Sequence, residues 1–208
     1  MKKFILILLC VFTCVFLSAC TKDGEISLQE KINTTLKNMT SYEAEGNLIR
    51  FDGKGKTEYT VKQYWQNDGK YRLEILSPDK FKGNYTVYNG SEVCQYNPSV
   101  KDSIIRNVPQ STARNQIFVG EFVKNYFNSE NVSCAVGNFD ESTCTVIEAV
   151  IPGGNKYSAT EKLWVDNESI KPVKLVLYDS EGNERYIMEF DSFEYNKEFD
   201  QSLFEAPN

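Results

Sequence analysis

The sequence predicts an α+β fold that is mainly β: one large, curved antiparallel sheet forming an open half-barrel, with helices covering its concave face. Two observations lead to this prediction. Most of the chain alternates apolar and polar residues with the period of two that is typical of strands with one solvent-exposed face. Aromatic residues make up 13% of the chain and fall mostly in these alternating segments, which favours strands.

The beginning of the chain has the pattern of an export signal followed by a tether. Lys2 and Lys3 precede an apolar run from residue 4 to 17, which has the length of a signal-peptide core and is short for a membrane span. Small residues then precede Cys20, as in bacterial lipoproteins, where the cysteine thiolate accepts the lipid. We therefore predict a signal peptide over 1–19, lipidation of Cys20 and a lipidated tether over 20–26. The alternative is an ordinary secretory signal with a chance cysteine.

A lipid anchor on Cys20 would hold the rest of the chain outside the cytoplasm, on the outer face of a membrane. Removal of residues 1–19 takes away two lysines and leaves 21 basic against 29 acidic residues, a net charge of −8. This excess of acid argues against a nucleic-acid partner and against docking on anionic lipid. The length of segment 27–208 suits a single domain with a buried core.

The residue types exclude several kinds of active site. The chain contains no histidine, which excludes Ser-His-Asp and Cys-His catalysis and removes the commonest zinc ligand. We predict no catalytic residue, no metal site and no cofactor. Cys134 and Cys144 flank a turn-rich segment and could face each other across a hairpin, where they either form a disulfide or remain unpaired buried thiols. Cys94 would be a free, buried cysteine.

The first element expected after the tether is a helix over 27–39. Ser27 and Glu30 have the spacing of a capping box, in which each side chain accepts a backbone N–H of the other residue. Apolar residues then follow at helical spacing: Leu28, Ile32, Leu36 and Met39. We interpret this segment as an amphipathic helix that buries one face in the core.

A meander of five antiparallel strands is expected between Tyr42 and Tyr96. Its strands are separated by turn sequences at Asp52 to Gly55, Asn67 to Gly69, Ser77 to Asp79, and Asn89-Gly90. The segment 97–109 is expected to be irregular, because Pro98 breaks the alternation and Pro109 ends the segment.

A second helix is expected over about 112–128, with Ser111 as its N-cap, and it could plug the open side of the curved sheet. Five further strands then follow, at 131–137, 143–151, 157–165, 172–178 and 184–195. The tail from Asn196, which carries Phe199, Leu203 and Phe204, is expected to lie along the sheet edge.

Motifs in both halves of the chain resemble the LolA/LolB-like lipoprotein carriers and the sporulation lipoproteins that share their fold. In the first half the resemblance rests on 36–42, Gly46, Trp65, 69–74, Asn89-Gly90 and 96–98. In the second half it rests on 163–166, 172–175, 178–179, Gly182, Phe190, 193–196 and Phe204. Within this group, the chain is most similar to the clostridial germination-specific lipoproteins of the GerS type.

The resemblance implies a single LolA-like domain over 27–208 in a non-enzymatic lipoprotein of a sporulating bacterium. Such a protein would bind and allosterically activate the cortex N-acetylmuramoyl-L-alanine amidase CwlD, which is needed for muramic-δ-lactam formation and for later cortex hydrolysis in germination. Activation requires tighter binding to the active state of the amidase than to its inactive state. The implied location is the forespore intermembrane space. The motifs do not identify the residues that contact the partner.

Other functions remain open at this point. A LolA-like fold could carry acyl chains in a cavity lined by Leu48, Val61, Trp65, Leu73 and Ile75, although the same residues would also suit a packed core. A sensor that binds an envelope regulator would be equally non-catalytic.

Acid pairs leave an enzyme as a further alternative, since two carboxylates can run glycoside hydrolysis. The pairs are Glu43/Glu45, Glu181/Glu184 and Asp140/Glu141. They fall in predicted turns or on polar strand faces, where solvation is the ordinary explanation. The exposed edges of long hairpins also allow a strand-swapped homodimer, with segment 52–55 as a hinge.

Overall fold

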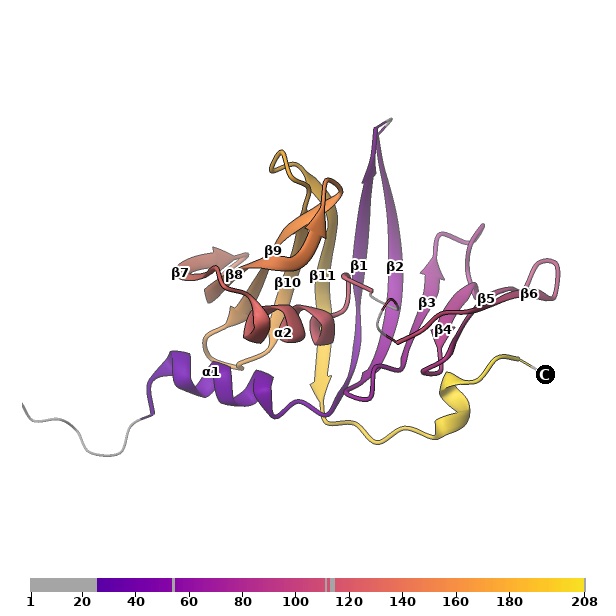
Figure 1. Cartoon of the computed structure of the whole chain (residues 1–208), viewed down its shortest axis with the longest axis horizontal. Helices are drawn as coiled ribbons and strands as arrows, with labels where there is room; N and C mark the ends of the chain where they lie inside the picture. The colour runs from indigo at the N-terminus through magenta and orange to yellow at the C-terminus, as the bar shows by residue number, and fades with distance from the viewer. Residues whose placement is uncertain (1–25, 54, 111, 113–114, 208) are drawn as a thin grey trace, which may run out of the picture.

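One antiparallel sheet of eleven strands organises the computed structural model, and it confirms the predicted open, mainly β fold (Figure 1). The structure describes residues 26–53, 55–110, 112 and 115–207. The strands are β1 (Ser41–Asp52), β2 (Gly55–Gln66), β3 (Tyr71–Ser77), β4 (Tyr85–Tyr88), β5 (Glu92–Asn97), β6 (Asp102–Asn107), β7 (Val132–Phe139), β8 (Ser142–Asn155), β9 (Ser158–Asp166), β10 (Pro172–Tyr178) and β11 (Glu184–Tyr195). Their order in the sheet is β6-β5-β4-β3-β2-β1-β11-β10-β9-β8-β7. The chain therefore forms two meanders that the pairing of β1 with β11 joins.

The junction between the two meanders depends on a glycine. Ala44 lies opposite Phe193 and Leu48 opposite Met188, with a register shift between Glu45 and Gly46. A Cβ on Gly46 would overlap the backbone of the neighbouring strand at Glu189. The absence of a side chain therefore allows β11 to approach β1 closely at the point where the ladder shifts.

The first helix begins where the sequence predicts. In α1 (Leu28–Lys37), the Glu30 N–H donates to Ser27 Oγ at 3.2 Å, which satisfies one of the free donors at the helix start. Ile32 and Leu36 are buried and join the main core.

The second helix, α2 (Val119–Asn128), begins later than predicted. Its N-cap is Phe118, which makes no side-chain capping bond; the predicted cap, Ser111, lies outside the described residues. The physical reason is the burial of Phe118, whose ring packs 5.0 Å from that of Tyr71 in an extended backbone conformation. Tertiary packing of this ring replaces the helical turn that the spacing suggests.

The sheet curves around α2, which crosses its concave face and links β6 to β7 (Figure 1). Side chains of α1, α2 and this face form the main core, which includes Ile32, Leu36, Tyr42, Val61, Trp65, Phe118, Phe122, Ile147 and Leu163. The two helices also contact each other, since Tyr126 Oη donates to Asn33 Oδ1 at 2.9 Å. The central and β7–β11 parts of the concave face are therefore covered.

The C-terminal tail does not follow the sheet edge as predicted. It leads into a short 3₁₀ helix, η1 (Gln201–Phe204). This helix lies on the face of the sheet opposite to α2, because Phe204 packs with Val87 whereas the neighbouring Tyr88 belongs to the core beneath α2. Phe204 is buried there against Val87 and Cys94, and Arg72 donates to the carbonyl of Leu203 at 3.2 Å. Because inward and outward residues alternate, β4 and β5 present apolar side chains on both faces, and the tail covers the second face. Cys94 is free and buried, as predicted.

The segment expected to be irregular contains a strand. β6 pairs with β5 along its whole length after a turn in which Lys101 has a φ of 52°. Ile104 and Ile105 face opposite sides and are 56% and 49% exposed. A strand at the edge with both faces exposed has no apolar alternation, and this is why the sequence pattern misses it.

Among the described residues, no helix combines the length and apolar character needed to cross a membrane. The predicted signal peptide and Cys20 lie outside the described residues.

Candidate functional site

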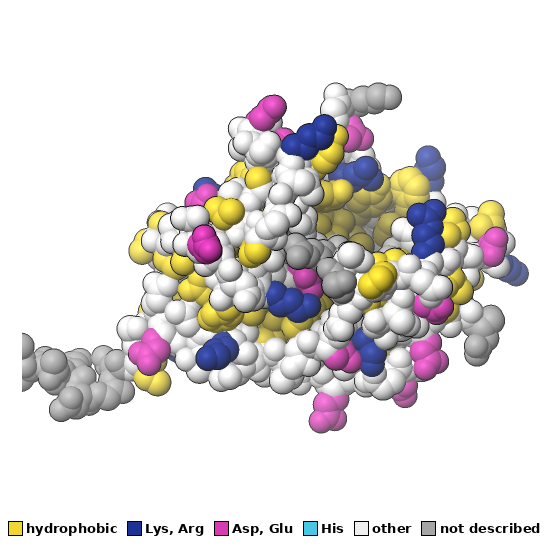
Figure 2. All heavy atoms as spheres, viewed as in Figure 1, with side chains coloured by type: hydrophobic (Ala, Val, Ile, Leu, Met, Phe, Trp, Pro, Cys, Tyr) yellow, Lys and Arg dark blue, Asp and Glu magenta, His cyan; other side chains and the backbone are white. Residues whose placement is uncertain are grey.

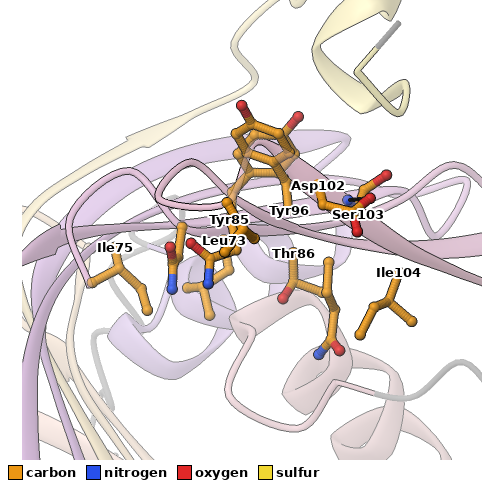
Figure 3. Close-up of a pocket in the computed structure, with 12 residues that line it drawn as sticks. Leu73, Ile75, Tyr85, Thr86, Tyr96, Asp102, Ser103 and Ile104 are labelled. Atoms are coloured by element: carbon orange, nitrogen blue, oxygen red, sulfur yellow. Dashed lines mark hydrogen bonds between the residues drawn. The ribbon is translucent and has the colours of Figure 1, made fainter. Parts of the chain in front are cut away.

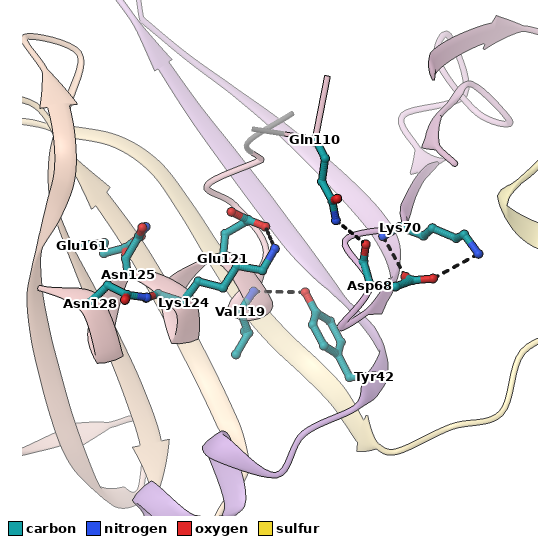
Figure 4. A network of polar contacts seen from close by, with 10 residues as sticks. All are labelled: Tyr42, Asp68, Lys70, Gln110, Val119, Glu121, Lys124, Asn125, Asn128 and Glu161. Carbon is teal, nitrogen blue, oxygen red and sulfur yellow. Dashed lines mark hydrogen bonds and ion pairs between the residues drawn. The ribbon is translucent and has the colours of Figure 1, made fainter. Parts of the chain in front are cut away.

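The concave face is the candidate functional site, and α2 divides it into a covered and an open part. The N-terminus of α2 is fixed by a buried chain of hydrogen bonds. The Val119 N–H donates to Tyr42 Oη at 3.1 Å (Figure 4). This hydroxyl donates to Gln63 Oε1 at 2.9 Å. Gln63 Nε2 donates in turn to the carbonyl of Ile117 at 3.1 Å. Burial raises the pKa of Tyr42 well above its usual value, so the hydroxyl stays protonated and can donate.

The linker that leads into α2 is also held near its beginning. Gln110 Nε2 donates to the carbonyl of Asp68 at 2.7 Å, and Asp68 pairs with Lys70 at 3.1 Å in the turn between β2 and β3 (Figure 4). The described parts of this linker are therefore attached to the sheet at residue 110 and again at Ile117.

Close contact between α2 and the sheet requires a glycine in the first turn of the helix. A Cβ on Gly120 would overlap the indole ring of Trp65. Trp65 is 3% exposed, and its Nε1 has no hydrogen-bond partner among the described residues. The helix therefore lies directly on the ring, and the Lys124 ammonium is 5.8 Å from the ring centre.

A buried carboxyl group lies under the second half of the helix. Glu161 on β9 is fully buried, and its Oε1 accepts from Asn125 Nδ2 at 2.8 Å. Its Oε2 has no partner among the described residues. Burial raises the pKa of Glu161 from 4.5 to about 7; the Asn125 bond lowers the pKa and the charge of Glu121 raises it. Glu121 itself pairs with Lys124 at 2.6 Å.

The strands β3 to β6, at the end of the sheet away from α2, bear a groove of about 420 Å³. It is lined by Leu73, Ile75, Asn84, Tyr85, Thr86, Gln95, Tyr96, Asn97, Val100, Asp102, Ser103 and Ile104. Leu73, Ile75, Thr86 and Ile104 project to one side of the strands, while Tyr85 and Tyr96 stack on the other side (Figure 3). Hydrophobic side chains also line a hollow above α2 in the space-filling view (Figure 2). The part of the concave face formed by β3 to β6 is therefore open and largely apolar.

The five residues considered for a cavity divide between the core and the groove. Leu48, Val61 and Trp65 are 7%, 0% and 3% exposed and belong to the packed core. Leu73 and Ile75 are partly buried and line the groove. The packed-core interpretation is thus confirmed for three of them.

The expectation that Cys134 and Cys144 face each other is wrong. In the β7–β8 hairpin Cys134 lies opposite Ile147 and Cys144 opposite Gly137, and both cysteines are free. An offset of three residues puts the two side chains on opposite faces of the hairpin, because side chains alternate along a strand. Cys144 is buried, whereas Cys134 is exposed and accepts from Gln29 Nε2 at 2.9 Å.

The acid pairs lie apart from both the groove and the covered core. Asp140/Glu141 and Glu181/Glu184 are exposed and lie in or next to turns. Glu43 pairs with Lys62 at 3.1 Å across two strands. No group of three or more acidic, cysteine or histidine residues able to hold a metal ion occurs within the described ranges.

Sequence reasoning did not identify Gln63 and Glu161, although a signal for both exists. Gln63 continues the inward series of Tyr59, Val61 and Trp65, and Glu161 shares its strand face with Leu163. A polar residue in the inward phase of a strand indicates a buried hydrogen bond. For both residues the partner lies on or next to α2.

Comparison with known proteins identifies the family. Residues 1–204 match the model of the YdcC-like sporulation proteins, so the chain belongs to this family. It is 24% identical over 205 residues to sporulation protein YdcC of Bacillus subtilis (strain 168), a match that covers 98% of this chain and 60% of that protein. The chain thus spans about 60% of the length of this relative.

Solved structures share the fold. An uncharacterised conserved protein of Thermus thermophilus is 16% identical, with a TM-score of 0.55, over 87% of this chain and 95% of that chain. A chain of the Clostridioides difficile CwlD amidase in complex with the GerS lipoprotein is 25% identical, with a TM-score of 0.50, over 81% of this chain and 94% of that chain. A LolA superfamily protein of Nitrosomonas europaea is 13% identical, with a TM-score of 0.46, over 88% of this chain and 99% of that chain.

Proposed function

We propose that this YdcC-like sporulation protein is a non-enzymatic, membrane-anchored lipoprotein that binds a cortex peptidoglycan amidase of the CwlD type and stabilises its active conformation. The likeness to a chain of the CwlD–GerS complex carries the proposal, because it extends over 94% of that chain at 25% identity. Membership of a sporulation family supports the same cellular process. A shared fold alone would not support a shared partner.

The chemistry of the chain favours binding over catalysis. The sequence contains no histidine, and the acid pairs that could serve a hydrolase are exposed or, at Glu43, paired with a lysine. The one carboxyl group in the described ranges with a strongly raised pKa, Glu161, is fully buried beneath α2 and cannot reach a polymer such as peptidoglycan.

Lipidation of Cys20 is part of the proposal and fixes where activation occurs. The anchor would hold the chain outside the cytoplasm, in the forespore intermembrane space of a spore former, where an amidase acting on cortex must work. Radiolabelled palmitate should be incorporated into the full chain and not into the Cys20→Ser variant. Equal labelling of both chains would contradict this assignment.

The activator function is tested by mixing the chain from residue 22, which retains every described element, with a purified cortex amidase from the same organism. We expect strong stimulation of amide cleavage in peptidoglycan and co-elution of the two proteins on a sizing column. An unrelated acidic protein of similar size and charge serves as the control for non-specific effects. Absence of both stimulation and complex at tens of micromolar would contradict the proposal.

A second candidate function is the binding of an acyl chain, which the groove over β3–β6 favours. Its volume of about 420 Å³ lies within the range of ligand sites. Acyl chains found by mass spectrometry in the purified protein should be lost in Ile75→Asp, which places a charge in the groove. Ile105→Asp, on the opposite face of β6 from Ile104, is the matched control and should retain them.

A further inference from the structure

β7 is an edge strand without the features that normally prevent an edge from pairing with another chain. Its sequence, VSCAVGNF, contains no charged residue and no proline over eight residues. Charges, proline, short length or bulges usually protect such edges. β6, at the opposite edge of the sheet, has six residues and carries Asp102 and Arg106. Of the two edge strands, β7 therefore has fewer features that oppose pairing with another chain.

The backbone of β7 offers hydrogen-bonding groups on its outer side. The Val150 N–H donates to the carbonyl of Asn131 at 3.1 Å, which shows that the odd-numbered residues of this segment bond to β8. Hydrogen-bonded and non-bonded positions alternate in an antiparallel ladder. The N–H and C=O groups of Val132, Cys134 and Val136 therefore point away from β8, and β7 is the last strand in the sheet.

The side chains at these positions form a pattern that is symmetric about Cys134. Val132, Cys134 and Val136 share one face, because they are two residues apart. Val132 is 48% and Val136 79% exposed. If a second copy of β7 pairs antiparallel about Cys134, each Val132 meets Val136 of the other copy and the two Cys134 side chains meet each other. A two-fold interface requires this kind of self-complementarity.

Charge and neighbouring apolar surface agree with a second copy as the occupant. The chain is acidic, with a net charge of −6, so two copies associate best through a surface that places no like charges opposite each other. β7 meets this condition. The start of α1 lies beside it, as the Gln29 bond to Cys134 shows. Ile26 and Leu28, which lie within three residues of Gln29 in the sequence, are also exposed, at 66% and 40%.

We propose that two copies of this chain associate through antiparallel pairing of β7 with β7, with the two-fold axis at Cys134. The sheet then continues from one copy into the other. No element is exchanged between copies, so this arrangement differs from strand swapping at segment 52–55. The proposal does not depend on the amidase partner.

Cysteine cross-linking of the full chain in its own membranes tests the pairing and its register. Mild oxidation with copper-phenanthroline should produce a disulfide-linked dimer through Cys134, because opposed residues in such a ladder lie about 5.5 Å apart at Cα. Cys134→Ser should abolish the dimer, whereas Cys144→Ser should not, since Cys144 is buried.

A mixed cross-link separates the specific dimer from random collisions of exposed thiols. In a Cys134→Ser background, a chain with Val132→Cys should cross-link to a chain with Val136→Cys and not to itself. Val136→Lys, with Cys134 retained, should lower the cross-linked fraction about tenfold, because it places an unpaired charge in the ladder. Val150→Lys on β8 is the matched control and should leave the cross-linked fraction unchanged.

Three results would overturn the proposal. The first is the absence of a Cys134 cross-link. The second is self-linking by the Val132→Cys chain as efficient as the mixed cross-link. The third is a cross-link of Cys134 to a different protein in place of a second copy.

Discussion

Replacing Glu161 by glutamine should remove a large part of the pH dependence of stability. The carboxyl group is fully buried, and burial raises its pKa from 4.5 to about 7. The charged group that faces it from α2 is Glu121, which also raises the pKa of Glu161. Glutamine has nearly the same shape, and its side-chain oxygen can still accept from Asn125. The substitution therefore removes the proton equilibrium while keeping the contact with α2.

The sign and size of the effect follow from linkage. Because the folded-state pKa is the higher one, the folded state binds more protons between pH 4.5 and about 7. The contribution of Glu161 to stability is therefore greatest below pH 4.5, falls as the pH rises through this window and levels off above it. A shift from 4.5 to about 7, at 1.36 kcal/mol per pH unit, corresponds to about 3 kcal/mol. For a chain of this size that is roughly 10 °C in melting temperature.

Urea unfolding followed by circular dichroism at half-unit steps from pH 4.5 to 8.5 measures the effect. The difference in free energy of unfolding between Glu161→Gln and the parent chain should grow with pH and reach about 3 kcal/mol in favour of the variant above pH 7. Glu184→Gln, at an exposed position on β11, is the matched control and should follow the parent chain. A pH-independent difference for Glu161→Gln would refute the reasoning.

Two further substitutions test how α2 is held. Gly120→Ala should destabilise the chain by about 1–3 kcal/mol in thermal unfolding, because the added Cβ overlaps the ring of Trp65; Gly53→Ala, with open space around it, should have little effect, and equal melting temperatures would exclude the close contact. Tyr42→Phe should reduce the free energy of unfolding in urea by about 1–3 kcal/mol, because the Val119 N–H and Gln63 Oε1 lose their shared partner. Tyr157→Phe, at a side chain that is 59% exposed, is its control, and matching losses in the two variants would argue against the buried network.

The strands were predictable because alternation directly reflects burial on one face. The ranges expected for the last two strands, 172–178 and 184–195, agree with β10 and β11. The start of α1 was predictable because a capping residue acts locally. The start of α2 was not, since it depends on the packing of Phe118 on the distant Tyr71. The strand β6 was not, since both of its faces are exposed and it has no apolar alternation.

The candidate site was less predictable than the fold. The groove exists because α2 covers one part of the concave face and leaves β3–β6 open. No local sequence pattern indicates how much of a sheet a helix packed across it will cover. The relation between Cys134 and Cys144 depended on hairpin register, in which an error of one residue reverses the face of every side chain.

Glu161 and Gln63 suggest why α2 lies where it does. A well-packed apolar residue at the position of Glu161 would usually be at least as stable as a buried carboxyl group with one unpartnered oxygen. Glu161 accepts a hydrogen bond from Asn125 on α2, and Gln63 donates one to the carbonyl of Ile117 just before the helix. Apolar packing alone would allow the helix to slide along the sheet, whereas a displaced helix would leave these polar groups unpaired in the core. We therefore interpret the buried polar residues as the features that fix the position of α2, and with it the boundary between the covered and open parts of the concave face.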